Sequence, residues 1–270
     1  MAHVRALVIA GYGTNCEMET AHACRLAGAR ADIVHMSEIL SGACSIGAYH
    51  FLNLPGGFLD GDDLGSAQVE GVRLRHARIR TTGRTLLEEI EDFIGRGMLI
   101  LGVCNGFQAL VKSALLPGEP RGQRRVSLTF NDSGRFEDRW VRLKVNPESP
   151  CVFTRGIESL VLPVRHGEGK FVTDTDDTLA ELEGNGMIAL WYADEGLRPT
   201  MDYPANPNGS LAAVAGICDK TGRVFGLMPH PEAYVHPTNH PCWTRLPALP
   251  AAGDGLALYK NAVSFLRGIV

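Results

Sequence analysis

The stretch LGVCNGFQAL, residues 101–110, places one cysteine, Cys104, where an apolar run ends and a helical pattern begins. Residues 98–103 are apolar and predict a buried strand, and the residues that follow predict a helix. Gly102 and Gly106 flank the cysteine, and glycine permits a turn so sharp that the side chain at its apex projects from the edge of the sheet. The free N–H groups at the start of a helix favour thiolate over thiol. The spacing therefore predicts a nucleophilic cysteine, and the alternative is a small buried cysteine in an ordinary strand-to-helix turn.

Apolar runs alternate with helical patterns on both sides of this turn. Strands are expected at residues 4–11, 31–36, 50–54 and 98–103, and helices at 16–29, 84–97 and from 106 to about 116. This order predicts an α/β fold with a doubly wound, mostly parallel sheet and flanking helices. Additional strands are expected in the second half, at 124–131, 139–145, 160–166, 211–219 and 224–230, before a final helix at 255–269. The segments 59–84, 194–210 and 233–253 fit neither pattern.

Length and composition allow one large α/β domain or two small ones. We expect a single domain over residues 1–270, with a loop-rich extension at about 233–253 and a C-terminal helix. The chain is 45% hydrophobic and can bury a large core. Its formal net charge of −4 excludes nucleic acid as an expected main partner. A membrane is not expected either, because no apolar run approaches the roughly 20 residues that a span needs. Seven scattered cysteines do not indicate a disulfide framework, and we expect a cytoplasmic protein.

The stretch LMPHPEA, residues 227–233, supplies a candidate base and acid for the cysteine. Pro229 and Pro231 favour an extended backbone, which would place the side chains of His230 and Glu232 on the same side. The carboxylate of Glu232 could then hold one ring nitrogen of His230 and leave the other free to accept a proton from a thiol. The alternative is a histidine beside a glutamate on the surface.

A third motif, NLPGGF at residues 53–58, ends an expected strand in two glycines, Gly56 and Gly57. Backbone amides exposed in such a turn can donate to a developing oxyanion, and the N–H of Asn105 is a second candidate donor. The alternative is a plain tight turn.

The motifs GVCNGFQAL, LPGGF and MPHPE, in this order, resemble those of class I, or triad type, glutamine amidotransferases. The resemblance implies a flavodoxin-like sheet and a glutaminase that forms a cysteinyl thioester. It implies a triad of Cys104, His230 and Glu232, and oxyanion donors at Gly57 and Asn105. It also implies that the residues holding the glutamine substrate are Gly56, Gln108, His166, Gly167, Glu168 and Gly169.

Within that class, the motifs PVRHGEGKF, NDSGRFEDRWV and YPANPNGS are similar to those in the glutaminase part of phosphoribosylformylglycinamidine synthases. This resemblance implies that ammonia passes to a synthetase subunit, which uses ATP and Mg²⁺ to convert formylglycinamide ribonucleotide in purine biosynthesis. A small accessory subunit is a further candidate partner, and no cofactor is expected in this chain. Ala233 and the stretch 59–66 depart from the family pattern, which bears on contacts with the partner.

Two other functions fit parts of the pattern. A stand-alone cysteine hydrolase would share the cysteine turn but should lack HGEG at 166–169 and YPANPNGS. An inactive regulatory subunit would be expected to have lost a residue of the triad. The Gly, Asn and Pro content of 59–84, of HGEG at 166–169 and of the segment YPANPNGS further predicts a mobile rim around the pocket.

Weaker signals concern cofactors. The stretch GYGTNC after the first strand has Cys16 where a dinucleotide-binding fingerprint needs its third glycine, and Thr14 with Glu17 instead predicts a capping box. His236, His240 and Cys242 have no fourth ligand in view, so no metal site is predicted there.

Overall fold

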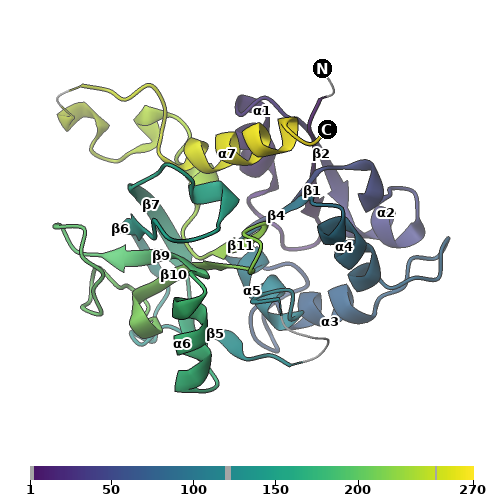
Figure 1. The fold of residues 1–270 in the computed structure, drawn as a ribbon, viewed down its shortest axis with the longest axis horizontal. Helices are drawn as coiled ribbons and strands as arrows, with labels where there is room; N and C mark the ends of the chain where they lie inside the picture. The colour runs from purple at the N-terminus through teal and green to yellow at the C-terminus, as the bar shows by residue number, and fades with distance from the viewer. Residues whose placement is uncertain (1–2, 119–122, 247) are drawn as a thin grey trace.

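One sheet of nine strands forms the centre of the part of the chain that the computed structural model describes, residues 3–118, 123–246 and 248–270 (Figure 1). The strands run in the order β2-β1-β3-β4-β11-β10-β9-β6-β7. In chain order they are β1 Arg5–Ala10, β2 Arg30–His35, β3 Phe51–Leu54, β4 Leu99–Val103, β6 Glu137–Val145, β7 Ser159–His166, β9 Ile188–Ala193, β10 Val214–Cys218 and β11 Val224–Leu227.

The first five strands of that order, β2-β1-β3-β4-β11, pair in parallel. Every residue of β3 and β4 is buried, as expected where helices cover both faces of a parallel sheet. This strand order is the flavodoxin-like one, so the predicted fold class is confirmed. In such a sheet, ligand sites lie at the carboxyl ends of the strands, and the Cys104 turn follows the end of β4.

Helices cover the two faces of this parallel half. In chain order they are α1 Glu17–Leu26, α2 Met36–Ser41, α3 Gln68–His76, α4 Leu86–Gly95, α5 Asn105–Lys112 and α7 Gly255–Arg267. Helix α6, Asp176–Gly184, lies instead in the second half of the fold, in contact with β8. Helix α1 packs with α7, and α3 packs with α5, on opposite sides of the strands (Figure 1). Helix α5 is shorter than expected, because the chain turns at Ala114, whose φ is +61°. None of the helices that the structure describes is long and apolar enough to cross a membrane.

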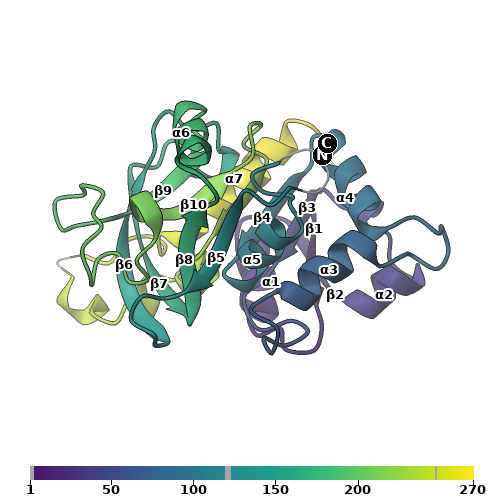
Figure 2. The same ribbon diagram turned by 90° about the horizontal axis from the view of Figure 1, so that it is seen from below.

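The remaining strands are antiparallel and extend the sheet from β11 through β10, β9 and β6 to β7. A separate two-stranded ribbon, β5 Val126–Phe130 with β8 Glu168–Thr173, lies beside α5 (Figure 2). The motifs predicted to hold substrate are therefore at the junction of the parallel half and this second layer. Strands β8 and β9 were not among the predicted ones.

The three segments without a predicted structure differ from one another. Segment 59–84 contains α3, and Gly71 of this helix lies against Lys112 of α5 so closely that an added Cβ would be 2.8 Å from the Lys112 Cβ. Segment 194–210 has no helix or strand but is folded by hydrogen bonds of its own side chains. The described part of 233–253, which leaves out residue 247, holds only short 3-10 turns.

Candidate active site

Cys104 occupies a strained turn between β4 and α5. Its φ is +51° and its ψ is −104°, a conformation that residues other than glycine seldom adopt. The two flanking glycines are required by packing: a Cβ on Gly106 would lie 1.9 Å from the carbonyl oxygen of Leu54, and one on Gly102 would lie 2.6 Å from that of Gly106. The turn predicted from the sequence is therefore present, with the thiol at the first turn of α5.

His230 and Glu232 form a buried pair. The Nδ1 atom of His230 lies 2.5 Å from Oε1 of Glu232, and both side chains are at most 3% exposed. The two residues meet through a different backbone from the one predicted, since Pro231–Ala233 is a 3-10 turn and not an extended strand. The turn follows from the fixed φ of Pro231, which suits the first position of a helix as well as a strand.

The charge state of His230 is set by its neighbours. Burial by itself would lower the pKa of His230, but Glu232 and Cys104 together raise it well above its ordinary value. The other ring nitrogen, Nε2, is buried and has no hydrogen-bond partner among the described residues. Cys104 itself contacts the carbonyl oxygen of Arg165, with Sγ 3.6 Å away.

Two free backbone N–H groups border the thiol. Gly57 has a φ of +144°, and Gly13 holds it in place by accepting a hydrogen bond of 2.7 Å from the N–H of Phe58. The N–H groups of Gly57 and Asn105 have no acceptor among the described residues. Free N–H groups beside a nucleophile are the feature that an oxyanion site needs.

The side chains of Asn105 and Gln108 join three loops by hydrogen bonds. Asn105 accepts from the N–H of Leu59 at 3.2 Å and donates to Gln108 Oε1 at 3.3 Å. Gln108 in turn donates to the carbonyl oxygen of Glu168 at 2.6 Å. Both side chains are buried, so the glycine loop at 56–59 and the turn at 166–169 are tied to the first turn of α5.

The turn from His166 to Gly169 is fixed by two buried asparagines. Asn131 donates to the carbonyl oxygen of His166 at 2.8 Å and accepts from the N–H of Gly169 at 3.0 Å. Asn208 donates to the carbonyl oxygen of Gly169 at 2.8 Å. Burial, together with the charge of His230, lowers the pKa of His166 to about 3, so this imidazole is neutral at physiological pH.

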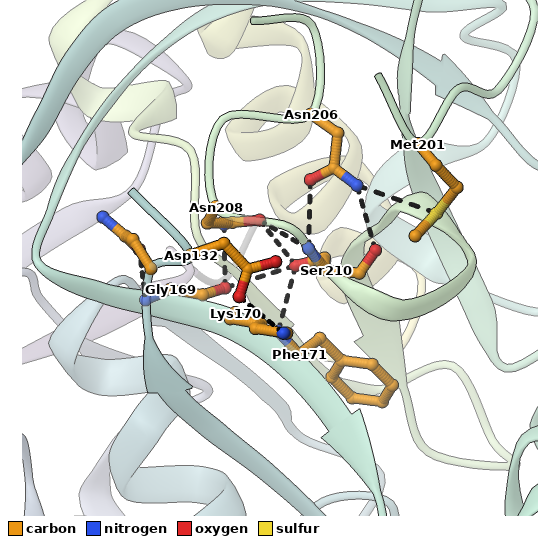
Figure 3. A network of polar contacts seen from close by, with 9 residues as sticks. Asp132, Gly169, Lys170, Phe171, Met201, Asn206, Asn208 and Ser210 are labelled. Atoms are coloured by element: carbon orange, nitrogen blue, oxygen red, sulfur yellow. Dashed lines mark hydrogen bonds and ion pairs between the residues drawn. The ribbon is translucent and has the colours of Figure 1, made fainter. Parts of the chain in front are cut away.

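The segment 203–210 is held against the same turn. Figure 3 shows Asn206, Asn208 and Ser210 gathered over the strand that carries Gly169 and Phe171. The Ser210 hydroxyl donates to Oδ1 of Asn208 at 2.7 Å and accepts from the N–H of Phe171 at 3.0 Å. Asn206 donates to the carbonyl oxygen of Ser210 at 2.9 Å. These three side chains are at most 1% exposed. The asparagines of this segment thus form a buried network, which composition alone did not indicate.

A pocket of about 270 Å³ lies over the thiol. Of the residues predicted for the site, those that line it are Gly57, Cys104, Gln108, His166, Gly167, Glu168 and His230. The other predicted residues, Gly56, Asn105, Gly169 and Glu232, are next to lining residues in the chain or bonded to them. The lining also includes residues that were not predicted, namely Asn15, Cys16, Phe58, Asp62, Ser66, Phe130, Phe136 and Arg165. Only their position next to the quoted motifs could have indicated them.

The supporting asparagines were also not predicted as site residues. Asn131 and Asn208 lie in the motifs NDSGRFEDRWV and YPANPNGS, which were noticed for their resemblance and not for a role. Their function depends on a contact between segments some 40 residues apart, and no local pattern reports such a contact.

The GYGTNC stretch and the histidines near residue 240 form local hydrogen bonds. Cys16 is the N-cap residue of α1 without a side-chain cap, so the predicted capping box of Thr14 and Glu17 is wrong; the Thr14 hydroxyl accepts from the N–H of Gly11 instead. The helix begins two residues later than that box requires. Nδ1 of His236 forms a hydrogen bond with the hydroxyl of Thr238, and Nδ1 of His240 accepts one from the N–H of Cys242.

Comparison with known proteins identifies the family. The model of the CobB/CobQ-like glutamine amidotransferase domain matches residues 3–266. A phosphoribosylformylglycinamidine synthase subunit PurQ from Dehalococcoides mccartyi is 43% identical over 100% of both chains. PurQ from Methanococcus maripaludis is 41% identical over 97% of both chains. The chain belongs to the PurQ family of glutamine amidotransferases.

A solved structure of a related complex has the same fold. A chain in the structure of PurLQS from Thermotoga maritima matches with a TM-score of 0.71 and 28% identity, over 98% of this chain and 100% of that one. The predicted family and the prediction of an enzyme are thereby confirmed, and the fold class agrees with that of a PurQ structure.

Proposed function

We propose that this amidotransferase hydrolyses glutamine to glutamate and ammonia through a thioester on Cys104, and supplies the ammonia to phosphoribosylformylglycinamidine synthesis. The observation that carries the proposal is the meeting of a strained cysteine turn with the buried His230–Glu232 pair at one pocket. The family relatives named as synthase subunits support the same reaction.

The first half of the reaction forms the thioester. Nε2 of His230 accepts the thiol proton, and the Cys104 thiolate attacks the side-chain carbonyl carbon of glutamine. The carbonyl oxygen becomes an oxyanion that accepts from the free N–H groups of Gly57 and Asn105. When the intermediate collapses, the carbon–nitrogen bond breaks, and imidazolium His230 gives its proton to the departing nitrogen, which leaves as ammonia.

The second half hydrolyses the thioester. A water molecule loses a proton to Nε2 of His230 and attacks the carbonyl carbon, and the carbon–sulfur bond then breaks to release glutamate. Glu232 stabilises the imidazolium in both halves and fixes the tautomer that leaves Nε2 free. Because Glu232 and Cys104 both raise the pKa of His230, the site favours the imidazolium that forms when His230 takes up a proton.

The walls of the pocket suit a polar amino acid. Gly56 leaves room beside the His230 ring, since a Cβ there would lie 2.6 Å from its Cε1 atom. Gln108, Glu168 and the neutral His166 offer hydrogen-bonding groups on the opposite side, with Gly167 and Gly169 shaping the turn between them. A Cβ on Gly169 would lie 2.4 Å from the His166 ring, so glycine is needed for this approach.

The partner in this proposal is the synthetase subunit, with a small accessory subunit as a further partner, in the cytoplasm. The synthetase subunit would bind ATP and Mg²⁺, and this chain would use no cofactor of its own. Phe130 and Phe136 line the pocket and are 69% and 56% exposed, which suits a mouth that a partner protein covers. Such a cover would keep ammonia from bulk water, where it becomes ammonium.

The test is covalent labelling by an electrophilic glutamine analogue, together with ammonia release from glutamine. We expect Cys104→Ala to lose both, because no other cysteine of the described chain lies in such a turn. Cys242→Ala, which removes an exposed thiol, is the control and should keep both. Labelling that persists in Cys104→Ala would refute the assignment, and hydrolysis of simple esters in preference to glutamine would favour a stand-alone hydrolase. Absence of any labelling in the unmodified chain would favour an inactive regulatory subunit.

A further inference from the structure

A second thiol reaches the His230–Glu232 pair from the side away from the proposed reaction. Cys16, at the start of α1, has its Sγ atom 3.9 Å from Nδ1 of His230. The Cys16 sulfur, a ring nitrogen of His230 and a carboxylate oxygen of Glu232 all lie within 4.8 Å of one another. Thiolate, imidazole and carboxylate are the three ligand types that Zn²⁺ takes in proteins.

The carboxylate of Glu232 has unused bonding capacity. Oε2 of Glu232 is buried and has no hydrogen-bond partner among the described residues, and its side chain is 1% exposed. An unpartnered carboxylate oxygen in such a place is costly unless a cation or a donor reaches it.

Gly56 lies directly against two of the ligand atoms. A Cβ built on this glycine would lie 3.3 Å from Nδ1 of His230 and 3.4 Å from the Cys16 sulfur, so a side chain here would crowd both atoms. Cys16 also lines the pocket, which provides a path from solvent.

We infer that Cys16, His230 and Glu232 form an inhibitory site for Zn²⁺. Tetrahedral Zn²⁺ with bonds of about 2.0–2.3 Å separates a nitrogen and an oxygen ligand by about 3.3 Å, and a sulfur and a nitrogen by about 3.5 Å. The observed separations are 2.5 Å between His230 and Glu232 and 3.9 Å between Cys16 and His230. Shifts of less than about 1 Å in buried side chains would bring the ligands to a metal, with water from the pocket as the fourth ligand.

Metal binding would stop the reaction by removing the base. Zn²⁺ accepts an electron pair from Sγ, from Nδ1 and from a Glu232 oxygen. The thiol proton of Cys16 is released to solvent, and the ring proton of His230 moves from Nδ1 to Nε2, so that the bound imidazole is the neutral Nε2–H tautomer. It can no longer accept the proton of Cys104. This consequence rests on the proposed function, whereas the metal site itself rests only on the geometry.

Two other thiols are the competing sites. Cys104 could hold a metal together with Nε2 of His230, on the other edge of the ring. Cys242 is exposed, so its thiol could bind a metal at the surface without selectivity. Burial raises the pKa of Cys16, so its thiol is protonated until a metal displaces the proton.

The experiment titrates the full chain, freed of metal by a chelator, with Zn²⁺ in a calorimeter and with Co²⁺ in a spectrophotometer. A cysteine ligand gives Co²⁺ a thiolate charge-transfer absorption in the near ultraviolet, which does not depend on turnover. The same measurements are made on Cys16→Ser, Cys16→Ala, Cys104→Ser and Cys242→Ser, after thermal unfolding has shown that each is folded. Inhibition of glutamine hydrolysis by Zn²⁺ and its reversal by chelator form a separate readout.

We expect both Cys16 variants to lose the charge-transfer absorption and to raise the Zn²⁺ dissociation constant at least about tenfold. Cys104→Ser and Cys242→Ser should keep both signals. Loss of the absorption in Cys104→Ser with retention in Cys16→Ser would place the metal on the nucleophile and overturn the inference. Unchanged binding in the Cys16 variants, or loss only in Cys242→Ser, would overturn it as well. Covalent labelling of Cys104 tests the proposed function independently, so the two failures can be told apart.

Discussion

The N–H of Leu59 donates a hydrogen bond of 3.2 Å to the side-chain oxygen of Asn105, one residue after the nucleophile. Leu59 follows the glycine loop whose Gly57 offers a free N–H, so this bond fixes the loop relative to the thiol. Gln108 continues the connection from Asn105 to the carbonyl oxygen of Glu168. The first turn of α5 thus follows the proposed nucleophile directly and connects the two sides of the pocket by hydrogen bonds.

We predict that Asn105→Ala lowers kcat for glutamine by about tenfold or more and changes KM little. The loosened loop would hold the Gly57 N–H less well, and loss of a complete oxyanion donor costs about 10²–10³ in kcat. The measurement is steady-state ammonia release.

Asn146→Ala is the matched control for that variant. Asn146 also accepts from one backbone N–H, that of Glu148, and donates to one carbonyl oxygen, that of Ile188. It lies between β6 and β9, outside the pocket. An equal loss of kcat in both variants would show that Asn105 acts through general stability and does not position the loop.

The parallel half of the fold and the cysteine turn could be predicted from the sequence because both depend on local patterns. Buried strands such as β4 are continuous apolar runs, and the steric need for Gly102 and Gly106 is visible in the spacing itself. Strand β8 was not predicted, because it begins with Glu168 in a glycine-rich turn and forms a two-stranded ribbon with β5, apart from the main sheet.

The asparagines that support the pocket from behind could not be predicted in the same way. Asn208 contributes through a contact with Gly169, and its segment has the composition of a mobile loop. Composition reports the backbone preference of a segment, whereas burial of its side chains depends on what folds over it. The His230–Glu232 pair shows the opposite case, since the contact was predicted correctly although the backbone was not.

Gly106→Ala should destabilise the chain by about 3 kcal/mol, because its Cβ would overlap the carbonyl oxygen of Leu54 and force β3 away from α5. Gly184→Ala is the matched control, since nothing lies within 4 Å of its Cβ and its φ is ordinary. That control should be neutral or stabilising by about 0.5 kcal/mol. Chemical denaturation measures both, and equal stabilities would contradict the packing argument.

Glu232→Gln should keep the fold and lower turnover by about 10⁴-fold, by analogy with loss of the orienting acid in other triads. The variant also removes a charge that raises the pKa of His230. A raised pKa stabilises the folded state below the unfolded histidine pKa of about 6.5, and this contribution is lost as pH rises through the higher folded value. The stability difference between the native chain and Glu232→Gln should therefore be larger at pH 6 than at high pH. Near-normal turnover would show that another group orients His230.

Glu70→Gln should remove a loss of native stability that grows as pH rises. Burial, followed by the nearby charge of Asp60, raises the pKa of Glu70 well above its ordinary value, and Oε2 of Glu70 has no partner among the described residues. The unfolded chain releases this proton near pH 4.3 and the folded chain releases it later, so native stability falls as pH rises between the two values. The variant should gain stability relative to the native chain from pH 4 to pH 7. The exposed Glu195→Gln, as control, should not, and parallel pH profiles for Glu70→Gln and the native chain would contradict the prediction.

The division of labour between subunits gives a last prediction. If this chain only generates ammonia, removal of its nucleophile should leave the synthetase reaction intact when ammonia is supplied. Cys104→Ala is a small change inside the pocket, where the residue is 6% exposed, so it should not disturb docking of a partner at the pocket mouth. A complex reconstituted from Cys104→Ala and the synthetase subunit should therefore make product from added ammonium salt with ATP, and none from glutamine. The measurement is product formation with each nitrogen source, and the native complex is the control. Loss of the ammonia-dependent reaction in the variant complex would show that Cys104 contributes to the synthetase step itself, while product from glutamine would show that another group supplies the ammonia.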